Sequence, residues 1–299
     1  MQNMSGLHRD PLPEARPLAA PVGFVGLGNI GLPMARALTR AGHALRVHDR
    51  DPQRMRAAED AGMTTAPGGV KDLAGCAVVA LAVSDDDATE QVLTGTSGLL
   101  AALAPGSLVL LHSTLLPATV HRLGRQGQAH GVELVDAPVS GGAQRALRGE
   151  LTVMAGGSEA AMTLARPYLE AIATETVHVG PLGAGAVAKL ANQLMMFSAL
   201  AGAYEALDLA KAHGVDTDAV LRAVGSSTGD SWVTREWGFF EEVAAAYERS
   251  GVPRHQRSWS KDLWDVVATA REAQLPVPYA ALLAQTLAQR IEHRGAEES

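Results

Sequence analysis

The sequence predicts an α/β N-terminal half followed by an all-α C-terminal half, and three observations support this prediction. Apolar runs typical of strands alternate with helix-like stretches through the first half of the chain. A glycine-rich turn separates the first apolar run from the first helical stretch. After Pro181 the pattern becomes helical almost to the end of the chain, and no strand pairs are visible there.

The glycine-rich turn is Gly26-Leu27-Gly28-Asn29-Ile30-Gly31, and it follows the apolar run 22–25. An amphipathic helix is expected from Ile30 to Arg40, and a second strand over 44–48 ends in Asp49. Strand, glycine turn, helix, strand and acid follow one another in the order that holds a dinucleotide. The sequence therefore predicts a Rossmann domain that binds a nicotinamide dinucleotide.

Each residue of this pattern has an expected role. Gly26 permits a tight turn, Gly28 lets the backbone approach a pyrophosphate, and Gly31 lets the helix pack closely on the strand. The helix N-terminus offers unpaired N–H groups to the phosphates. Asp49 can accept hydrogen bonds from ribose hydroxyls and would repel a 2′-phosphate, which favours NAD. Arg50 can accept such a phosphate, so NADP stays possible.

Length and composition limit the remaining classes of function. The chain has 299 residues, enough for two domains, and its net charge of -7 without a basic stripe argues against nucleic acid as a partner. No apolar stretch reaches the length of a membrane span. The start, Met1 to Ala20, lacks the apolar core of a secretory signal. The single cysteine, Cys76, fits a core position and a reducing cytoplasm.

The domain organisation follows from these patterns. We expect a flexible tail over 1–20, a dinucleotide-binding domain over 21–182 and a helical domain for substrate binding and oligomerisation over 183–299. Further strands are expected at 77–83, 107–111, 132–139, 151–155 and 176–179, in a largely parallel sheet covered on both faces. Helices are expected at 184–213, 216–224, 231–249, 261–274 and 278–294, the first of them joining the domains.

All four tryptophans, Trp232, Trp237, Trp259 and Trp264, lie in the helical half. Aromatic side chains dominate both cores and subunit interfaces, and one or two of these can alternatively line a substrate cavity. Together with the apolar character of this half, they predict a homodimer or homotetramer.

The first stretch with chemical potential is Asp136 to Gly142, where an apolar strand ends in Ser140-Gly141-Gly142. Ligands of such sheets bind beyond the carboxyl ends of the strands. Successive N–H groups of this turn, with the Ser140 hydroxyl, can bind a carboxylate. An ordinary tight turn is the alternative interpretation.

The second stretch, Gly183 to Gln193, carries Lys189 among apolar neighbours near the start of the long helix. A lysine that is partly desolvated and close to another positive charge favours its neutral form, and it can then take the proton of a substrate hydroxyl. Asn192 and Gln193, about one turn further on, can orient the substrate. Periodicity alone would favour a surface lysine.

The third stretch, Lys261-Asp262-Leu263, is expected to open a helix. Asp262 suits a helix N-terminus, whereas Lys261 does so only if it points at an anion, and a solvated helix start is equally compatible. The string Gly225-Ser226-Ser227-Thr228-Gly229 matches a nucleophile elbow, but a helix precedes it, which predicts a loop. No phosphate-binding loop and no metal-ligand spacing is found.

Taken together, the glycine turn and the three stretches resemble the β-hydroxyacid dehydrogenase family, over about Val22 to about Leu287. This family includes 3-hydroxyisobutyrate and L-threonate dehydrogenases and is more distantly related to 6-phosphogluconate dehydrogenase. The resemblance implies an N-terminal Rossmann domain and an all-helical C-terminal domain joined by a long interdomain helix. It implies Lys189 as the catalytic acid/base and Ser140, Gly141 and Gly142 as the binding site of the substrate carboxylate.

Further positions match cofactor contacts of the family. They are Val83, Ser84, Thr114 and Lys261, the last of which is implied near both cofactor and substrate. The chain departs from the family at Ser84, where a proline is usual, and at Gln193, where a second asparagine is common. It also carries Arg145-Ala146 where a glycine and an alanine usually follow the Ser-Gly-Gly turn.

The resulting prediction is a cytoplasmic, NAD-dependent oxidoreductase that oxidises a small 3-hydroxy acid to a semialdehyde or keto acid. One alternative is an NADPH-dependent semialdehyde or imine reductase, although imine reductases usually lack the lysine that stands here as Lys189. The other alternative is a dinucleotide-binding protein without catalysis.

Overall fold

The computed structural model describes residues 18–297, with side chains described as far as Arg294. The predicted flexible tail, residues 1–20, therefore lies almost entirely outside the described residues. The described chain divides into two compact units. The first unit contains residues 18–113 and 118–185, and the second contains residues 114–117 and 186–297.

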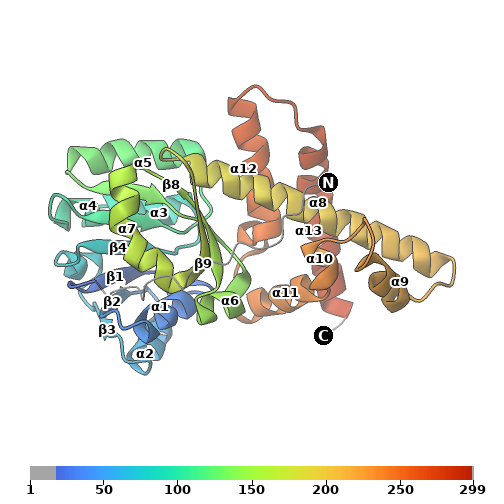
Figure 1. Cartoon of the computed structure of the whole chain (residues 1–299), viewed down its shortest axis with the longest axis horizontal. Helices are drawn as coiled ribbons and strands as arrows, with labels where there is room; N and C mark the ends of the chain where they lie inside the picture. Colours follow the sequence, from blue (N-terminus) through green and yellow to red (C-terminus); the bar gives the residue numbers. More distant parts are fainter. Residues whose placement is uncertain (1–17, 298–299) are drawn as a thin grey trace, which may run out of the picture. The chain divides into compact units, whose positions relative to one another are not determined.

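The first unit is built on a nine-stranded sheet (Figure 1). Its strands are β1 (Val22–Val25), β2 (Leu45–His48), β3 (Thr64–Thr65), β4 (Val78–Leu81), β5 (Leu108–Leu111), β6 (Glu133–Asp136), β7 (Val139–Ser140), β8 (Leu151–Gly156) and β9 (Ala173–Gly180). The neighbours β3-β2-β1-β4-β5-β6 are all parallel, while β8 runs antiparallel to β6 and β7 and parallel to β9. The order reverses beside β1, as in a Rossmann domain.

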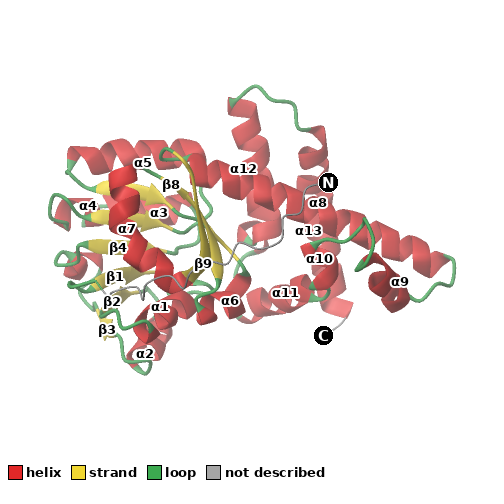
Figure 2. Ribbon diagram, in the orientation of Figure 1, coloured by secondary structure: helices red, strands yellow, loops and turns green. Residues whose placement is uncertain are grey.

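Helices flank this sheet, as Figure 2 shows. They are α1 (Gly31–Arg40), α2 (Pro52–Glu59), η1 (Val70–Leu73), α3 (Asp86–Thr94), α4 (Leu99–Ala102), α5 (Pro117–Ala129), α6 (Gly142–Arg148) and α7 (Glu159–Ile172). The central strands β1, β4 and β5 are buried along their whole length, which explains why they read as continuous apolar runs. Phe24, Met34 and Tyr168 are fully buried in the core between sheet and helices.

The second unit is helical. It contains most of the 29-residue helix α8 (Ala184–Ala212), which begins in the first unit. Its other helices are α9 (Thr217–Val224), α10 (Trp232–Arg235), α11 (Phe239–Arg249), η2 (Arg254–Gln256), α12 (Ser258–Glu272) and α13 (Pro278–Glu297). Phe197, Tyr204 and Trp259 are fully buried in its core, whereas Trp264 is 48 % exposed. Within residues 18–297, no helix is long and apolar enough to cross a membrane.

Three predicted elements differ from the structure. The strand expected over 132–139 is divided into β6 and β7, because Pro138 between them has no N–H to donate. The helix expected over 231–249 is broken at Gly238, where φ is 94°. The helix expected to open at Lys261 begins at Ser258 instead, and no side chain caps it, so the usual start signal is absent.

Candidate active site

The three glycines of the first turn differ in how much space a side chain would have at each position. At Gly26, φ is 92° and a Cβ would lie 2.4 Å from the Ala82 carbonyl oxygen. At Gly31, which opens α1, a Cβ would lie 1.9 Å from the Gly26 carbonyl oxygen. Gly28, in contrast, faces open space except for the Arg54 guanidinium 3.7 Å away. The turn therefore needs glycine for its own closure at two positions and presents bare backbone to a ligand at the third.

The neighbouring strand ends carry the other predicted cofactor residues of the first unit. Asp49, at the end of β2, is buried; its Oδ2 accepts a hydrogen bond from the Leu27 amide (2.7 Å) and its Oδ1 one from the Asp51 amide (2.8 Å). Its carboxylate is thus oriented by backbone and keeps acceptor capacity for hydroxyl groups. Because β2, β1, β4 and β5 are adjacent and parallel, their carboxyl ends lie along one edge of the sheet.

The ends of β4 and β5 are tied together by one side chain. The Ser113 hydroxyl donates to the Val83 carbonyl (2.9 Å) and accepts from the Val83 amide (3.1 Å). Ser84, the next residue, is exposed, and its hydroxyl donates to Asp85 at 2.9 Å. Val83 and Ser84 lie just after β4, which pairs with β1, the strand that leads into the glycine turn.

Arg54 is a residue of this edge that sequence reasoning missed. Its Nη1 lies 3.5 Å from Asp49 Oδ2, and its Nε lies 3.5 Å from Asp51 Oδ2. Asp51 caps α2 by accepting from the Gln53 amide, and Pro52 is the first helical residue. The pair Asp51-Pro52, an N-cap residue followed by proline at the first helical position, is the local signal that could have placed Arg54 on the first turn. Arg50, which the sequence singled out, is exposed.

The turn after β7 has a backbone that requires glycine. Ser140 ends β7, Gly141 has φ 136° and Gly142 has φ 72°. A Cβ at Gly141 would lie 3.1 Å from the Cβ of Arg145, so the Arg145 stem packs against this turn. Asp136, at the end of β6, is buried, and its Oδ1 accepts a hydrogen bond from the Gly183 amide at 2.7 Å.

A buried histidine supports the same segment. His112 donates from Nδ1 to the Ala137 carbonyl (2.7 Å), and its Nε2 accepts from the Tyr168 hydroxyl (2.8 Å). Both ring nitrogens are thereby satisfied in the neutral form. Complete burial lowers the pKa of His112 to about 4. The imidazole is therefore a structural group that stays uncharged at neutral pH.

The second unit contains Lys189, a buried lysine on α8. Its exposed fraction is 8 %, and among the described residues no hydrogen bond or ion pair holds its ammonium group. Burial lowers the pKa of Lys189, the nearby Asp262 carboxylate opposes this change, and the Lys261 ammonium lowers the pKa further. The result is an amine that is more readily neutral than an ordinary lysine.

Asp262, on α12, connects the polar groups around Lys189. Its Oδ2 accepts from the Gln193 carboxamide at 2.6 Å, and its Oδ1 lies 3.3 Å from Lys261 Nζ. Lys261 also donates to Asp265 and to the Thr114 carbonyl, each at 2.7 Å. The anions that Lys261 faces here belong to its own helix, which accounts for a lysine in the first turn.

The predicted site residues thus fall into two groups. The first unit holds Gly26, Leu27, Gly28, Asn29, Ile30, Gly31, Asp49, Arg50, Val83, Ser84, Ser140, Gly141 and Gly142. The second holds Thr114, Lys189, Asn192, Gln193 and Lys261. The assignment of Thr114 to the second unit follows from its segment 114–117, which no sequence pattern indicated. Asp262 belongs to the same group, because it contacts both Gln193 and Lys261. The sequence had indicated only that it lies at a helix start.

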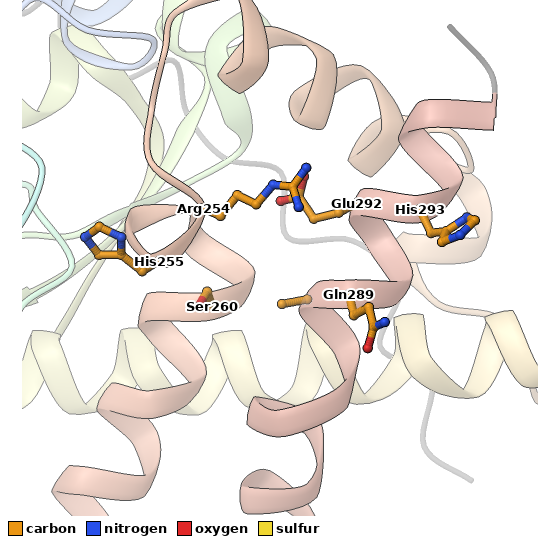
Figure 3. A pocket seen from close by; sticks show the side chains of 7 residues that line it. Arg254, His255, Ser260, Gln289, Glu292 and His293 are labelled. Atoms are coloured by element: carbon orange, nitrogen blue, oxygen red, sulfur yellow. The ribbon is translucent and has the colours of Figure 1, made fainter.

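A hollow of about 530 Å³ lies elsewhere in the second unit (Figure 3). It is lined by Arg254, His255, Ser260, Ala288, Gln289, Glu292 and His293, none of which was a predicted site residue. Glu292 is held by Arg257 and by the Trp259 indole N–H, and both imidazoles point away from the middle of the hollow in Figure 3. Across the described ranges, no group of three or more His, Cys, Asp or Glu can hold a metal ion.

Two family models match this chain, one in each half of the sequence. Residues 21–180 match the family model of the NAD-binding domain of 6-phosphogluconate dehydrogenase. Residues 183–299 match the model described as NAD-binding of NADP-dependent 3-hydroxyisobutyrate dehydrogenase. The chain is 35 % identical to an L-threonate dehydrogenase of Cupriavidus necator, covering 93 % of both chains. It is 33 % identical to a 3-hydroxyisobutyrate dehydrogenase of Pseudomonas aeruginosa, covering 87 % of this chain and 89 % of the other.

Solved structures give the same result. A 3-hydroxyisobutyrate dehydrogenase of Salmonella typhimurium superposes with a TM-score of 0.74 at 32 % identity, covering 89 % of this chain and 92 % of that one. Imine reductases also share the fold, for example that of Myxococcus stipitatus with TM-score 0.65 at 17 % identity, covering 91 % and 94 %. The chain has a glycine turn on a Rossmann sheet and a buried lysine on the long helix that follows, and its relatives match along both units. It therefore belongs to the β-hydroxyacid dehydrogenase family of NAD(P)-dependent oxidoreductases.

Proposed function

We propose that this protein oxidises the hydroxyl group of a small 3-hydroxy acid to a semialdehyde or keto acid, with NAD as the acceptor. The observation that carries the proposal is Lys189, a buried amine with no ion pair among the described residues and with a lowered pKa. A structural lysine would be exposed or paired. A neutral amine that is free to accept a proton is what alcohol oxidation needs.

The proposed chemistry divides the work between two groups of residues. The Ser140 hydroxyl and the amides of Gly141 and Gly142 bind the substrate carboxylate, a role that the resemblance to the family implies. Lys189 accepts the substrate hydroxyl proton at Nζ, and Asn192 orients the substrate. A bound nicotinamide dinucleotide would supply the hydride acceptor. Orientation of the reacting groups contributes much of the rate enhancement.

The first unit fits a nicotinamide dinucleotide, because the space beside Gly28 is open and the Asp49 carboxylate is oriented at the strand edge. We propose NAD as the preferred form, since the buried Asp49 would repel a 2′-phosphate. Arg54 is the observation that favours the alternative, an NADPH-dependent reductase acting on a semialdehyde or imine. Its guanidinium lies 3.5 Å from Asp49 and can screen that carboxylate.

We also propose that the protein is a cytoplasmic homodimer or homotetramer. Helix α8 carries three large apolar side chains that are exposed in the single chain: Val187, Met195 and Leu209. Met195 is 74 % exposed on a helix that has few charges along its first five turns. A second copy of the chain would cover such a face. Loss of the oligomer in Met195→Glu, measured by light scattering, would support this assignment, and an unchanged mass would contradict it.

A spectrophotometric screen tests the proposed reaction. The purified protein is offered NAD or NADP with 3-hydroxyisobutyrate, 3-hydroxypropionate, L-threonate, glycerate and serine, and reduction of the nucleotide is followed. We expect turnover of at least one acid with NAD as the better acceptor, and its disappearance in Lys189→Ala. Nucleotide binding without turnover of any acid would instead indicate a binding protein without catalysis. Faster turnover with NADPH and a semialdehyde or imine would indicate the reductase.

A further inference from the structure

Both ends of the Gln193 carboxamide are bonded within the protein. Gln193 is 4 % exposed on α8, its Nε2 donates to Asp262 Oδ2 at 2.6 Å, and its Oε1 accepts from Asn192 Nδ2 at 3.1 Å. One amide hydrogen and one oxygen lone pair of Gln193 are thereby engaged by protein neighbours. Gln193 is therefore placed to act on its protein neighbours.

The Asp262 carboxylate is fixed through both of its oxygens. Gln193 holds Oδ2, and the Lys261 ammonium lies 3.3 Å from Oδ1. Lys261 is itself anchored by the Thr114 carbonyl and by Asp265. Of these anchors, only Gln193 comes from α8, the helix that also carries Lys189. The hydrogen bond from Gln193 therefore fixes the carboxylate relative to the helix of the lysine.

The position of this carboxylate matters because of the charges around Lys189. Asp262 favours the protonated amine and Lys261 disfavours it, while Asp265 compensates Lys261. Burial raises the pKa of the Tyr247 phenol, and the Asp262 carboxylate contributes to the same change.

We propose that Gln193 is a positioning residue that holds the Asp262 carboxylate in place and, through it, sets the fraction of Lys189 that is neutral. This inference rests on the proposed role of Lys189 as the acid/base, and it assigns Gln193 to the residues that control that amine. The hydrogen bond draws charge from Oδ2 and fixes the place of that oxygen. Without it, Asp262 holds the Lys189 proton more firmly, and oxidation requires a higher pH.

The test compares Gln193→Met, which removes the carboxamide at similar volume, with Gln193→Asn, which keeps a carboxamide one methylene shorter. If Gln193→Met fails to fold, Gln193→Asn still tests the inference. Asp262→Asn and the double variant Gln193→Met/Asp262→Asn complete a cycle. Two quantities are measured in each protein. One is the pH at which kcat for hydroxy-acid oxidation is half-maximal. The other is the pH dependence of Lys189 carbamylation by cyanate in the protein without substrate, followed by peptide mass spectrometry.

We expect both midpoints to rise in either Gln193 variant and to fall by about 1 to 3 in Asp262→Asn. In the Asp262→Asn background the Gln193 substitution should have no further effect. An unchanged or lower carbamylation midpoint in the Gln193 variants would overturn the inference. A shift that persists without the Asp262 carboxylate would also overturn it, because Gln193 would then act by another route.

The two readouts separate this inference from the proposed function. If the carbamylation midpoints shift as expected while the kcat profile stays fixed, Gln193 does control Lys189, and Lys189 is not the catalytic acid/base. If neither Gln193 variant shifts the carbamylation midpoint but Lys189→Ala abolishes turnover, the proposed function stands and the role of Gln193 is wrong.

Discussion

The glycine-turn edge of the first unit and the lysine cluster of the second unit are built on opposite principles. The edge works through backbone shape: positive φ at Gly26, contact with the Ala82 carbonyl and open space beside Gly28. The cluster consists of Lys189, Lys261, Asp262 and Asp265, and it works through charge; Lys189 and Asp262 are buried, and the other two are half-buried. Shape of this kind tolerates no added atom, whereas the balance of charges can be adjusted in small steps.

This contrast predicts how each region responds to substitution. An added side chain in the tight glycine turn should remove cofactor binding and everything that depends on it. A change in the cluster should leave the cofactor bound and alter only the proton transfer. Four substitutions, ordered from the largest expected effect to the smallest, can break or sharpen the comparison.

Gly26→Ala should abolish NAD binding, because the new Cβ would lie 2.4 Å from a backbone carbonyl that cannot move away. Gly62→Ala is the matched control, since Gly62 also has a positive φ, 82°, but has nothing within 4 Å of a Cβ. The control should lose only about 1–2 kcal/mol of stability for its backbone conformation. Isothermal titration with NAD and thermal unfolding compare the pair. Equal affinities in the two variants would disprove the argument from close approach.

Lys189→Ala should lower turnover by about 10²–10⁴-fold with NAD affinity retained, because the residue that accepts the proton is lost. Lys211→Ala, at the exposed end of the same helix, is the control and should behave like the unchanged protein. Initial rates and nucleotide titrations measure both effects. If Lys189→Ala lost NAD binding together with turnover, the separation between edge and cluster would be wrong.

Acid should destabilise the first unit through His112, although this histidine has no part in the proposed proton transfer. Its folded-state pKa, about 4, lies below the ordinary 6.5, so the folded protein favours the neutral ring. The contribution of the neutral ring to the free energy of unfolding is fully present above pH 6.5. It falls by about 3 kcal/mol as the pH drops toward 4.

Urea unfolding at several pH values measures this loss, with His112→Gln as the variant that cannot titrate. That variant should show a weaker dependence on pH between 4 and 6.5. His130→Gln, at an exposed site, should keep the dependence of the unchanged protein. Identical slopes for all three proteins would show that another group causes the acid sensitivity.

Asp49→Asn should produce the smallest effect, a loss of about tenfold in NAD affinity, because a neutral acceptor replaces a charged one. The same change should raise the affinity for NADP, since repulsion of the 2′-phosphate disappears. Asp60→Asn, at an exposed position after α2, is the control. Affinities for both nucleotides are compared by titration. An unchanged ratio of the two affinities would show that Asp49 does not determine the preference, leaving Arg54 as the candidate.

The same contrast explains how much could be predicted from the sequence. The Rossmann fold with a following helical half was predictable, because buried parallel strands read as continuous apolar runs and the glycine turn has a fixed spacing. The burial of Cys76 was also predictable from its neighbours in the sequence, and it is confirmed.

The contacts within the lysine cluster were not predictable. The bond between Gln193 and Asp262 joins residues 69 positions apart on two helices, and no local pattern encodes such a distance. The start of α12 was placed three residues late, because Arg257 precedes it and makes no side-chain cap. Arg257 is instead buried between Glu248 and Glu292, a tertiary arrangement that local capping rules do not describe.

The carboxylate of Asp136 determines where the first unit can be cut away from the rest of the chain. It lies at the end of β6 and receives the Gly183 amide, while a Cβ at Gly156 or Gly185 would collide with its oxygens. A fragment that stops at Leu182 would leave a buried acid without that donor, a loss typically worth about 1–3 kcal/mol. A shortened protein intended for crystallisation or fusion should therefore retain the chain through Gly185.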